Sequence, residues 1–329
     1  MKLIIRNTAG LMLILLLMAA CARQIDESDS QVEQRLLNAF VQVNYSGITP
    51  TASGLFFIPQ GPQHGGQSPV EGNLLYMRFT TRDMNGNIVR TSVDSLARML
   101  GTHSFRTYYG PQFSSMASGA AVIGIQEAFS YMSPGDKARV LLPSWLSSHT
   151  VGGHRTATTT FIHDLELLRV VTDMAAFQTD SLQSFSQIHY GGIDSLKNDW
   201  YFVELTPGTG DLPAVGDTMK IRYAGYLLDG FMFDTNIRDT AVYEAAKFGQ
   251  RIGNNEPFNE LTVIIRENVS DMVVVSGFAH ALKEMTDGME AVTFFSSDYG
   301  YGSRQEGQIP PFSMLRFYVT VTINRVAAD

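Results

Sequence analysis

The stretch VGDTMKIRYAGYLLDGFMFDTN, residues 215–236, has the clearest secondary-structure pattern of the chain. Polar and apolar residues alternate through TMKIRY, and the strand that this alternation indicates runs into the turn sequence LLDG. A Gly in such a turn allows the backbone to reverse its direction. The stretch therefore predicts a half-buried strand and a tight turn of an antiparallel sheet.

The order of elements around this stretch occurs twice in the chain. Residues 53–89 correspond to residues 198–233, since each run has an apolar strand, a Gly/Pro turn, an alternating strand and a second turn. Residues 120–146 correspond in the same way to residues 273–299, each with an apolar entry, a Gly, an amphipathic helix of about ten residues and another strand. A repeat this long is a duplicated domain, not one unit of a solenoid. We therefore predict an α+β fold with two domains, each an antiparallel sheet with one short helix laid across it.

The N-terminus has the features of a bacterial secretory signal. Lys2 and Arg6 precede an unbroken apolar run at residues 11–20, which is too short to cross a bilayer as a helix. The run resembles a lipoprotein signal, which ends just before Cys21 and leaves that cysteine as a lipidated first residue. The other reading is an ordinary cleaved signal with a chance cysteine, but Cys21 is the only cysteine of the chain and has no disulfide partner. We expect acylated Cys21 to anchor the protein in a lipid bilayer of the cell envelope, the outer membrane, with the periplasmic or surface face left open.

Composition gives no sign of a nucleic-acid partner. The 329 residues carry a formal net charge of -8, and the 24 Lys and Arg are scattered without a basic run. His149, His154 and His163 lie close in sequence, but no cysteine or acidic cluster shares their spacing. We therefore predict no metal site and interpret them as solvated loop histidines. No Gly-rich phosphate-binding loop and no nucleophilic serine elbow occurs, and no cofactor is expected.

Residues from about Trp200 to Val326 resemble an FKBP-type (macrolide-binding) peptidyl-prolyl cis-trans isomerase domain. The resemblance rests on three stretches in the family's order: residues 215–236, VVVSGFAHALKEMTDGMEAV at 273–292 and DYGYGSRQEGQIPPFSMLRFYVTVTI at 298–323. It implies a curved antiparallel sheet wrapped around one short helix, with the active pocket between them. It also implies that YGYGSRQEGQIPP, residues 299–311, is a flap over that pocket.

The resemblance also assigns the residues of the pocket. The positions that match the family's catalytic residues are Tyr223, Phe233, Asp234 and Tyr301. The positions that match its substrate-binding residues are Phe258, Val274, Val275, Phe278, Ile309 and Phe317. By this match the Tyr301 hydroxyl and the Ile309 backbone hold substrate carbonyls, while Asp234 either fixes the pocket through Tyr223 or acts on the twisted carbonyl. A dry aromatic pocket favours the twisted amide over the planar, well-solvated ground state.

Two positions and one segment depart from the family pattern. Phe278 replaces the usual tryptophan at the base of the pocket, and Gln308 replaces an apolar residue on the flap. Residues 236–272 are longer than their counterpart in most such domains, and TAVYEAAKF within them suggests an extra helix. If residues 246–258 of this insertion fill the pocket, no catalysis is expected.

The first copy lacks the site residues. Phe79 stands where Tyr223 does, and Val89-Arg90 replace the Phe-Asp pair of the second copy. Ile125 replaces the aromatic base, and Ser148 falls at the position of the flap tyrosine. An isomerase site in the first copy is therefore not predicted.

The chain is expected to divide into a signal peptide (1–20), an acidic tether and lead-in helix (21–50), a degenerate FKBP-like domain (51–172), a linker helix (173–196) and an FKBP-type isomerase-like domain (197–329). The predicted function is that of an envelope lipoprotein, a peptidyl-prolyl cis-trans isomerase whose C-terminal domain isomerises X–Pro bonds in unfolded or proline-containing envelope polypeptides. The alternative is a non-catalytic envelope module, a chaperone or scaffold, that binds peptides or a partner.

Overall fold

The computed structural model describes residues 28–325, apart from residues 118, 120, 121, 148, 149, 152, 153 and 156–159. The predicted signal sequence, Cys21, Ser148 and His149 lie outside the described residues. Within the described part of the chain, no helix is both long enough and apolar enough to cross a membrane.

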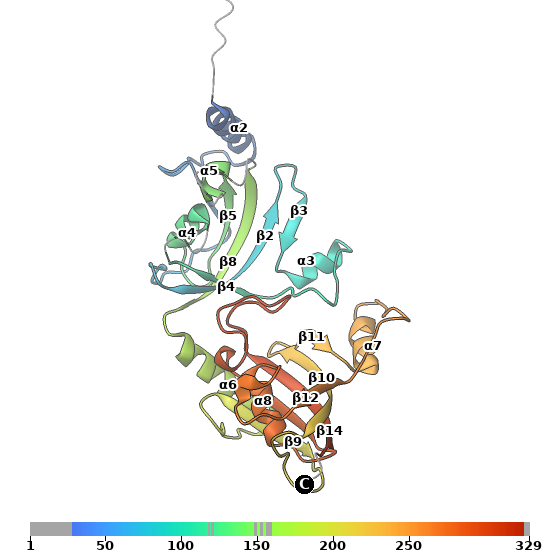
Figure 1. Cartoon of the computed structure of the whole chain (residues 1–329). Helices are drawn as coiled ribbons and strands as arrows, with labels where there is room; N and C mark the ends of the chain where they lie inside the picture. The colour runs from blue at the N-terminus through green and yellow to red at the C-terminus, as the bar shows by residue number, and fades with distance from the viewer. Residues whose placement is uncertain are drawn as a thin grey trace, which may run out of the picture.

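Two antiparallel sheets of six strands, one from each half of the chain, form the molecule (Figure 1). The first sheet has the order β1 (Phe56–Pro59), β5 (Lys137–Leu142), β8 (Phe161–Val171), β2 (Leu74–Arg82), β3 (Ile88–Thr91), and β4 (Gln112–Ser115) also pairs with β2. The second has the order β9 (Trp200–Thr206), β13 (Glu290–Phe295), β14 (Leu315–Asn324), β10 (Thr218–Leu227), β11 (Met232–Thr235), and β12 (Leu261–Ile264) also pairs with β10. The two orders are the same when the strands are matched along the chain, so the predicted duplication is present in the topology. The predicted α+β fold with two similar domains is confirmed.

Short helices accompany each sheet. They are α2 (Asp29–Asn44), α3 (Asp94–Met99), α4 (Ile123–Ser130) and α5 (Ser144–Ser147) in the first half, and α7 (Arg238–Ala246) and α8 (Ser276–Lys283) in the second. Single-turn 3₁₀ helices occur at Val269–Asp271 and Ser297–Tyr299, and β6 (Thr150–Val151) pairs antiparallel with β7 (His154–Arg155). Each domain thus has more helices than the one expected, and α7 lies where the sequence suggested an extra helix.

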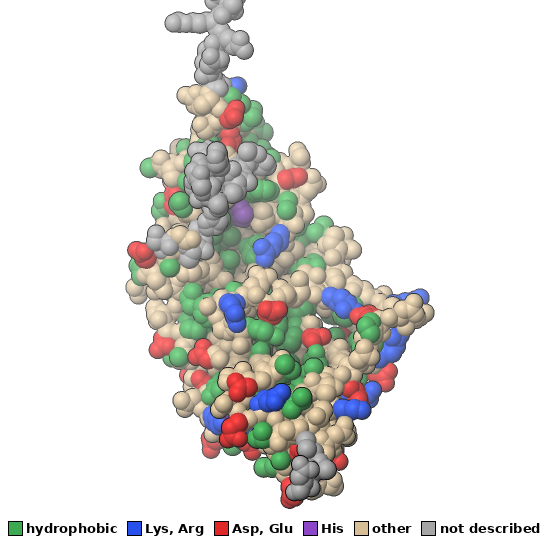
Figure 2. Space-filling model, viewed as in Figure 1, with side chains coloured by type: hydrophobic (Ala, Val, Ile, Leu, Met, Phe, Trp, Pro, Cys, Tyr) green, Lys and Arg blue, Asp and Glu red, His purple; other side chains and the backbone are tan. Residues whose placement is uncertain are grey.

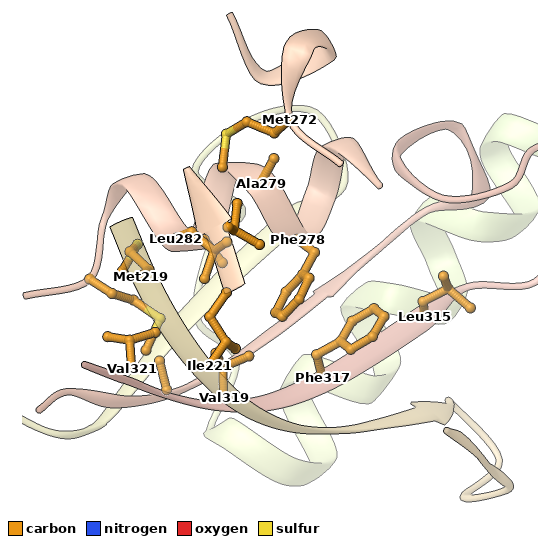
Figure 3. Close-up of a cluster of buried hydrophobic side chains, with 14 of the residues drawn as sticks. Met219, Ile221, Met272, Phe278, Ala279, Leu282, Leu315, Phe317, Val319 and Val321 are labelled. Carbon is orange, nitrogen blue, oxygen red and sulfur yellow. The ribbon is translucent and has the colours of Figure 1, made fainter. Parts of the chain in front are cut away.

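Helix α8 packs directly on the second sheet, and this contact forms the core of that domain (Figure 3). A Cβ atom at Gly277 would lie 2.5 Å from the ring of Phe295, so only glycine allows the helix to approach the strand this closely. The indole N–H of Trp200 donates to the Gly277 carbonyl oxygen at 2.8 Å. The next residue of the helix, Phe278, therefore points into the domain and is buried.

Helix α6 (Met174–Tyr190) joins the two domains (Figure 1). It begins at Asp173, whose carboxylate accepts a hydrogen bond from the Ala176 N–H, and ends at Gly191 in the left-handed conformation. Its buried Leu182 and Phe185 pack with aromatic and apolar residues of β9 and β13. The helix is therefore part of the packing of the second domain.

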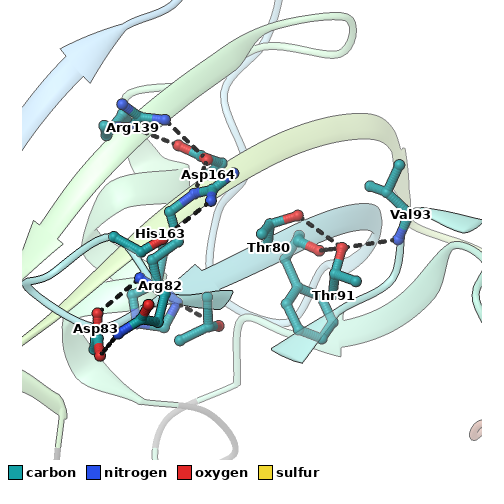
Figure 4. Close-up of polar contacts among 12 residues, drawn as sticks. Thr80, Arg82, Asp83, Thr91, Val93, Arg139, His163 and Asp164 are labelled. Atoms are coloured by element: carbon teal, nitrogen blue, oxygen red, sulfur yellow. Dashed lines mark hydrogen bonds and ion pairs between the residues drawn. The ribbon is translucent and has the colours of Figure 1, made fainter. Parts of the chain in front are cut away.

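Charged side chains in the described residues are mixed in sign over the face shown in Figure 2. In the first domain, Arg139 and Arg82 both donate hydrogen bonds to the Asp164 carboxylate (Figure 4). Burial alone would raise the pKa of Asp164, but the two guanidinium groups outweigh it and hold that pKa below its usual range.

The interpretation of His163 as a solvated loop residue is wrong. His163 lies in β8, and its Nδ1 is 3.1 Å from the Thr81 hydroxyl oxygen (Figure 4). Burial disfavours the charged imidazolium and lowers the pKa of His163 to about 4, although the neighbouring Asp164 charge acts in the opposite direction. The alternation of polar and apolar residues along β8 is the sequence signal that predicts a strand at this position.

The depressed pKa of His163 predicts a pH-dependent stability of the first domain. Between about pH 6.5, the ordinary value, and pH 4, the unfolded chain binds a proton at this histidine that the folded chain excludes. The free energy of unfolding should therefore fall as the pH drops through this window. Urea unfolding at pH 7 and pH 5 of the wild type and of His163→Gln tests this, because the variant should lose less stability than the wild type. Equal losses would contradict the assignment.

Candidate active site

The predicted pocket residues of the second domain form one aromatic cluster. Phe278 of α8 stacks on Phe317 of β14 with ring centroids 4.7 Å apart and an angle of 16° between the rings (Figure 3). The edge of Phe233 meets the Phe317 ring at 5.5 Å, and Tyr223 lies 5.9 Å from Phe278. Phe278 and Phe317 are only 2% and 5% exposed. The predicted aromatic side chains are therefore packed together between the helix and the sheet.

Gly225 in β10 creates the space for two of these rings. It pairs with Phe317 on one neighbouring strand and with Asp234 on the other. A Cβ atom at Gly225 would lie 2.6 Å from the Phe233 ring and 2.9 Å from the Phe317 ring. The missing side chain thus allows both rings to lie over the backbone of the strand.

Polar groups lie at one side of the aromatic cluster. The Tyr223 hydroxyl donates to the Asp234 carboxylate at 2.5 Å. Burial raises the pKa of Tyr223, and the hydrogen bond to Asp234 raises it further, so the phenol stays protonated and remains a donor. This contact holds the Asp234 carboxylate in place and favours the first of the two roles left open for it.

Tyr301 has its hydroxyl available for a ligand. Its ring packs against the cluster, and burial raises the pKa of the phenol, with smaller contributions from the charges of Glu306 and Asp234. Within the described part of the chain the hydroxyl makes no hydrogen bond. The group is therefore a protonated donor that is able to bind a carbonyl oxygen.

The Ile309 backbone does not have its predicted role in this structure. Its N–H donates to the Glu306 carbonyl at 2.8 Å, and its own carbonyl accepts from the Glu306 N–H at 3.1 Å, so both groups serve the internal structure of the flap. The Ile309 side chain is buried in the cluster at 4% exposure.

A backbone donor that the sequence argument missed lies at Val275. This residue precedes α8 and packs against the cluster, as Val274 does. Its N–H has no hydrogen-bond partner among the described residues. The predicted start of the helix could have indicated this donor, because the first N–H groups of any helix have no partner within the helix.

Phe258 lies apart from the other predicted residues. It is half-buried, and the Arg238 guanidinium of α7 is 5.6 Å from the centre of its ring. It does not belong to the described residues that pack against the aromatic cluster. The length of the insertion explains the difference, because the chain takes a longer path before β12 and shifts this aromatic toward α7.

The insertion turns toward the first domain. The ring of Phe248 lies 4.4 Å from the ring of His103, and the Gln250 carboxamide binds both the Phe105 N–H and the His103 carbonyl. Glu256 forms an ion pair with Arg106. Residues 246–258, the possible plug of the pocket, therefore contact the first domain.

The equivalent place in the first domain has different chemistry. The Arg90 guanidinium lies 5.0 Å from the centre of the Phe79 ring, where the second domain has the Tyr223–Asp234 pair. Ile125 packs on the core of the first domain. No hydroxyl or carboxylate takes the place of the pair, so the described residues provide no equivalent of the second site.

No metal site accompanies the pocket in the part of the chain that the structure describes. There, no group of three or more His, Cys, Asp or Glu side chains lies close enough to hold an ion. The groups that the structure does place together are buried aromatic rings, two protonated phenols, one carboxylate and a backbone N–H.

Comparisons with known proteins show which family this chain resembles. A family model described as FKBP-type peptidyl-prolyl cis-trans isomerase matches residues 210–322. The FK506-binding protein 1B of Emericella nidulans is 36% identical over 117 residues, which are 35% of this chain and 87% of that protein. The FKBP-type 22 kDa peptidyl-prolyl cis-trans isomerase of Escherichia coli is 30% identical over 129 residues, 39% of this chain and 51% of that protein. The crystal structure of the three FKBP domains of wheat FKBP73 aligns over 84% of this chain and 97% of that chain, with 16% identity and a TM-score of 0.30.

The fold and the family match define a protein with an FKBP-like isomerase domain. The chain belongs to the FKBP-type peptidyl-prolyl cis-trans isomerase family, and the family model matches residues 210–322. The enzyme class expected from the sequence is confirmed.

Gly225→Ala should damage both the stability and the activity of this site. Its methyl group would force the Phe233 and Phe317 rings away from the strand, at a cost of about 1–3 kcal/mol for an overpacked core. Gly253→Ala is the matched control, because a Cβ atom there meets no atom within 4 Å. Urea unfolding and isomerisation of a proline peptide measure the two effects. A Gly225→Ala protein with wild-type stability and activity would contradict the described packing.

Proposed function

We propose that the protein is a lipid-anchored foldase of the cell envelope whose C-terminal domain, residues 197–329, isomerises X–Pro bonds in unfolded or proline-containing envelope polypeptides. The proposal is carried by a buried aromatic cluster beside two donors, the Tyr301 hydroxyl and the Val275 N–H, that have no hydrogen-bond partner among the described residues. Residues 51–172 form the degenerate domain in this proposal, and residues 173–196 the linker.

The reaction needs little covalent chemistry from the protein. The barrier to rotation of a peptide bond is about 18–20 kcal/mol because amide resonance must be broken. The twisted amide has lost this resonance and its charge separation, so a dry aromatic surface binds it better than the planar form. Phe233, Phe278 and Phe317 supply this surface and exclude water from it.

The polar groups bind and orient the substrate chain. The Tyr301 hydroxyl and the Val275 N–H donate to carbonyl groups on either side of the proline and fix the chain while the bond between them rotates. Asp234, held by the Tyr223 hydroxyl, keeps the polar side of the pocket rigid.

An isomerisation assay tests this function. Residues 22–329 should accelerate the cis–trans exchange of a short Leu-Pro peptide, followed by NMR, well above its uncatalysed scale of tens of seconds. Tyr301→Phe, which removes only the hydroxyl, should lower kcat/KM about tenfold, the effect of losing one good hydrogen bond. Asp234→Asn should lower it as well.

Tyr243→Phe is the control for these variants, because Tyr243 lies exposed on α7 and its loss of a hydroxyl should leave kcat/KM unchanged. No acceleration by the wild type at high protein concentration would overturn the catalytic proposal. A non-catalytic module that binds peptides or a partner would then be the better account of the aromatic cluster.

Membrane attachment is tested through Cys21. When the full-length gene product is expressed in a bacterial host with a labelled fatty acid, the wild type should carry the label and sediment with membranes. Cys21→Ser should lose both properties. A Cys21→Ser protein that keeps the label would contradict acylation at this residue.

A further inference from the structure

The flap, residues 299–311, is held at its base by a residue of the linker helix. The Gln178 carboxamide of α6 donates to the Phe312 carbonyl at 3.0 Å and to the Ser297 hydroxyl at 2.9 Å, and it accepts from the Ser297 N–H at 2.9 Å. Ser297 lies just before the flap and Phe312 just after it. Gln178 is 3% exposed, so a single buried side chain ties both ends of the flap together.

The first domain contributes a second contact at the end of the flap. Phe312 has a positive φ of 60°, and its ring meets the edge of the Phe113 ring of β4 at 5.8 Å. Phe113 in turn contacts Phe177 of α6 at 5.6 Å. The unusual backbone conformation after the two prolines is thus supported by aromatic packing from outside the catalytic domain.

The tip of the flap contacts Tyr108 of the first domain. The Tyr108 N–H donates to the Gln308 carboxamide oxygen at 3.2 Å, and Gln308 directly precedes Ile309. Tyr108 itself is 9% exposed and belongs to the hydrophobic core of the second domain, with its ring 5.2 Å from the Phe231 ring. Its hydroxyl donates to the Asp229 carboxylate at 2.8 Å.

These contacts explain why two features of the chain depart from the family pattern. Gln308 provides an acceptor that an apolar flap residue lacks, and the insertion carries Phe248 and Gln250 to the first domain. Both departures therefore build the junction between the domains.

We propose that the linker helix and the degenerate first domain position the flap of the isomerase, through Gln178 at its base and Tyr108 at its tip. Neither residue touches the reacting bond. They act through the flap, which places the Tyr301 hydroxyl and the Ile309 side chain over the pocket. The proposal rests on the proposed isomerase function for its effect on the rate, but the positioning of the flap is measured without it.

Gln178→Leu in the full chain is the sharpest test, because leucine fills a similar volume and leaves the Ser297 N–H and the Phe312 carbonyl unpaired. We expect hydrogen exchange at the Glu306 and Ile309 amides to become about tenfold faster and kcat/KM to fall about tenfold. Ser181→Ala on the same helix is the control, since its hydroxyl donates to the Phe177 carbonyl of its own helix and to no other group among the described residues.

Gln308→Ala keeps the proposal testable if Gln178→Leu fails to fold, because Gln308 is exposed. Gln308→Ala should also speed hydrogen exchange at the flap amides. Gln308→Glu retains the acceptor oxygen and should return the exchange rate toward the wild-type value. A merely structural role of these residues would lower the thermal midpoint without a selective change in the flap.

The outcomes separate the two proposals. A wild-type chain that does not isomerise a Leu-Pro peptide overturns the proposed function, and the exchange rates still decide whether Gln178 and Gln308 position the flap. Wild-type exchange at Glu306 and Ile309 in both Gln178→Leu and Gln308→Ala would overturn the positioning proposal, whatever the activity of the wild type.

Discussion

The close approach of α8 to the second sheet sets the positions of the aromatic side chains in the site. Gly277 lies against the Phe295 ring without room for a Cβ atom, and the Trp200 indole fixes the Gly277 carbonyl. Because the helix is held at this distance, Phe278 lies flat on Phe317. A larger residue at position 277 would separate the layers and open the aromatic surface to water, which would remove the low-polarity environment that favours a twisted amide.

The duplication shows how one topology supports two different roles. Both sheets have the same strand order, so burial and register alone preserve the fold of the first domain. Its equivalent of the polar pair is Arg90 over Phe79, which offers a cation where the second domain holds a carboxylate beside a phenol. Residues 103–113 of the first domain contact the flap and the insertion of the second domain.

The strands and the short helix of each domain follow from local patterns, and these could be predicted. Alternation along β10 and the repeated Gly-turn signals depend only on neighbouring residues, and the structure gathers Tyr223, Phe278 and Phe317 as the motif register implied. Phe258 could not be placed, because the path of a long insertion is not set by its local sequence. The partner of Gln308 is a backbone N–H 200 positions away, and a backbone group leaves no trace in the residue type. The Ile309 N–H is hydrogen-bonded, whereas the Val275 N–H has no partner in the part of the chain that the structure describes, and side-chain matching reveals neither backbone property.

Peptide binding by the second domain is tested by an NMR titration of residues 22–329 with a Phe-Pro peptide, observed at the backbone amides. If a single pocket of the second domain binds the proline and the first domain holds its flap, the largest shifts occur at residues 274–278 and 299–311, with smaller shifts at residues 105–109 across the junction. Shifts confined to β2 and β3 of the first sheet, or shifts that leave Val275 and Tyr301 unchanged, would contradict the account.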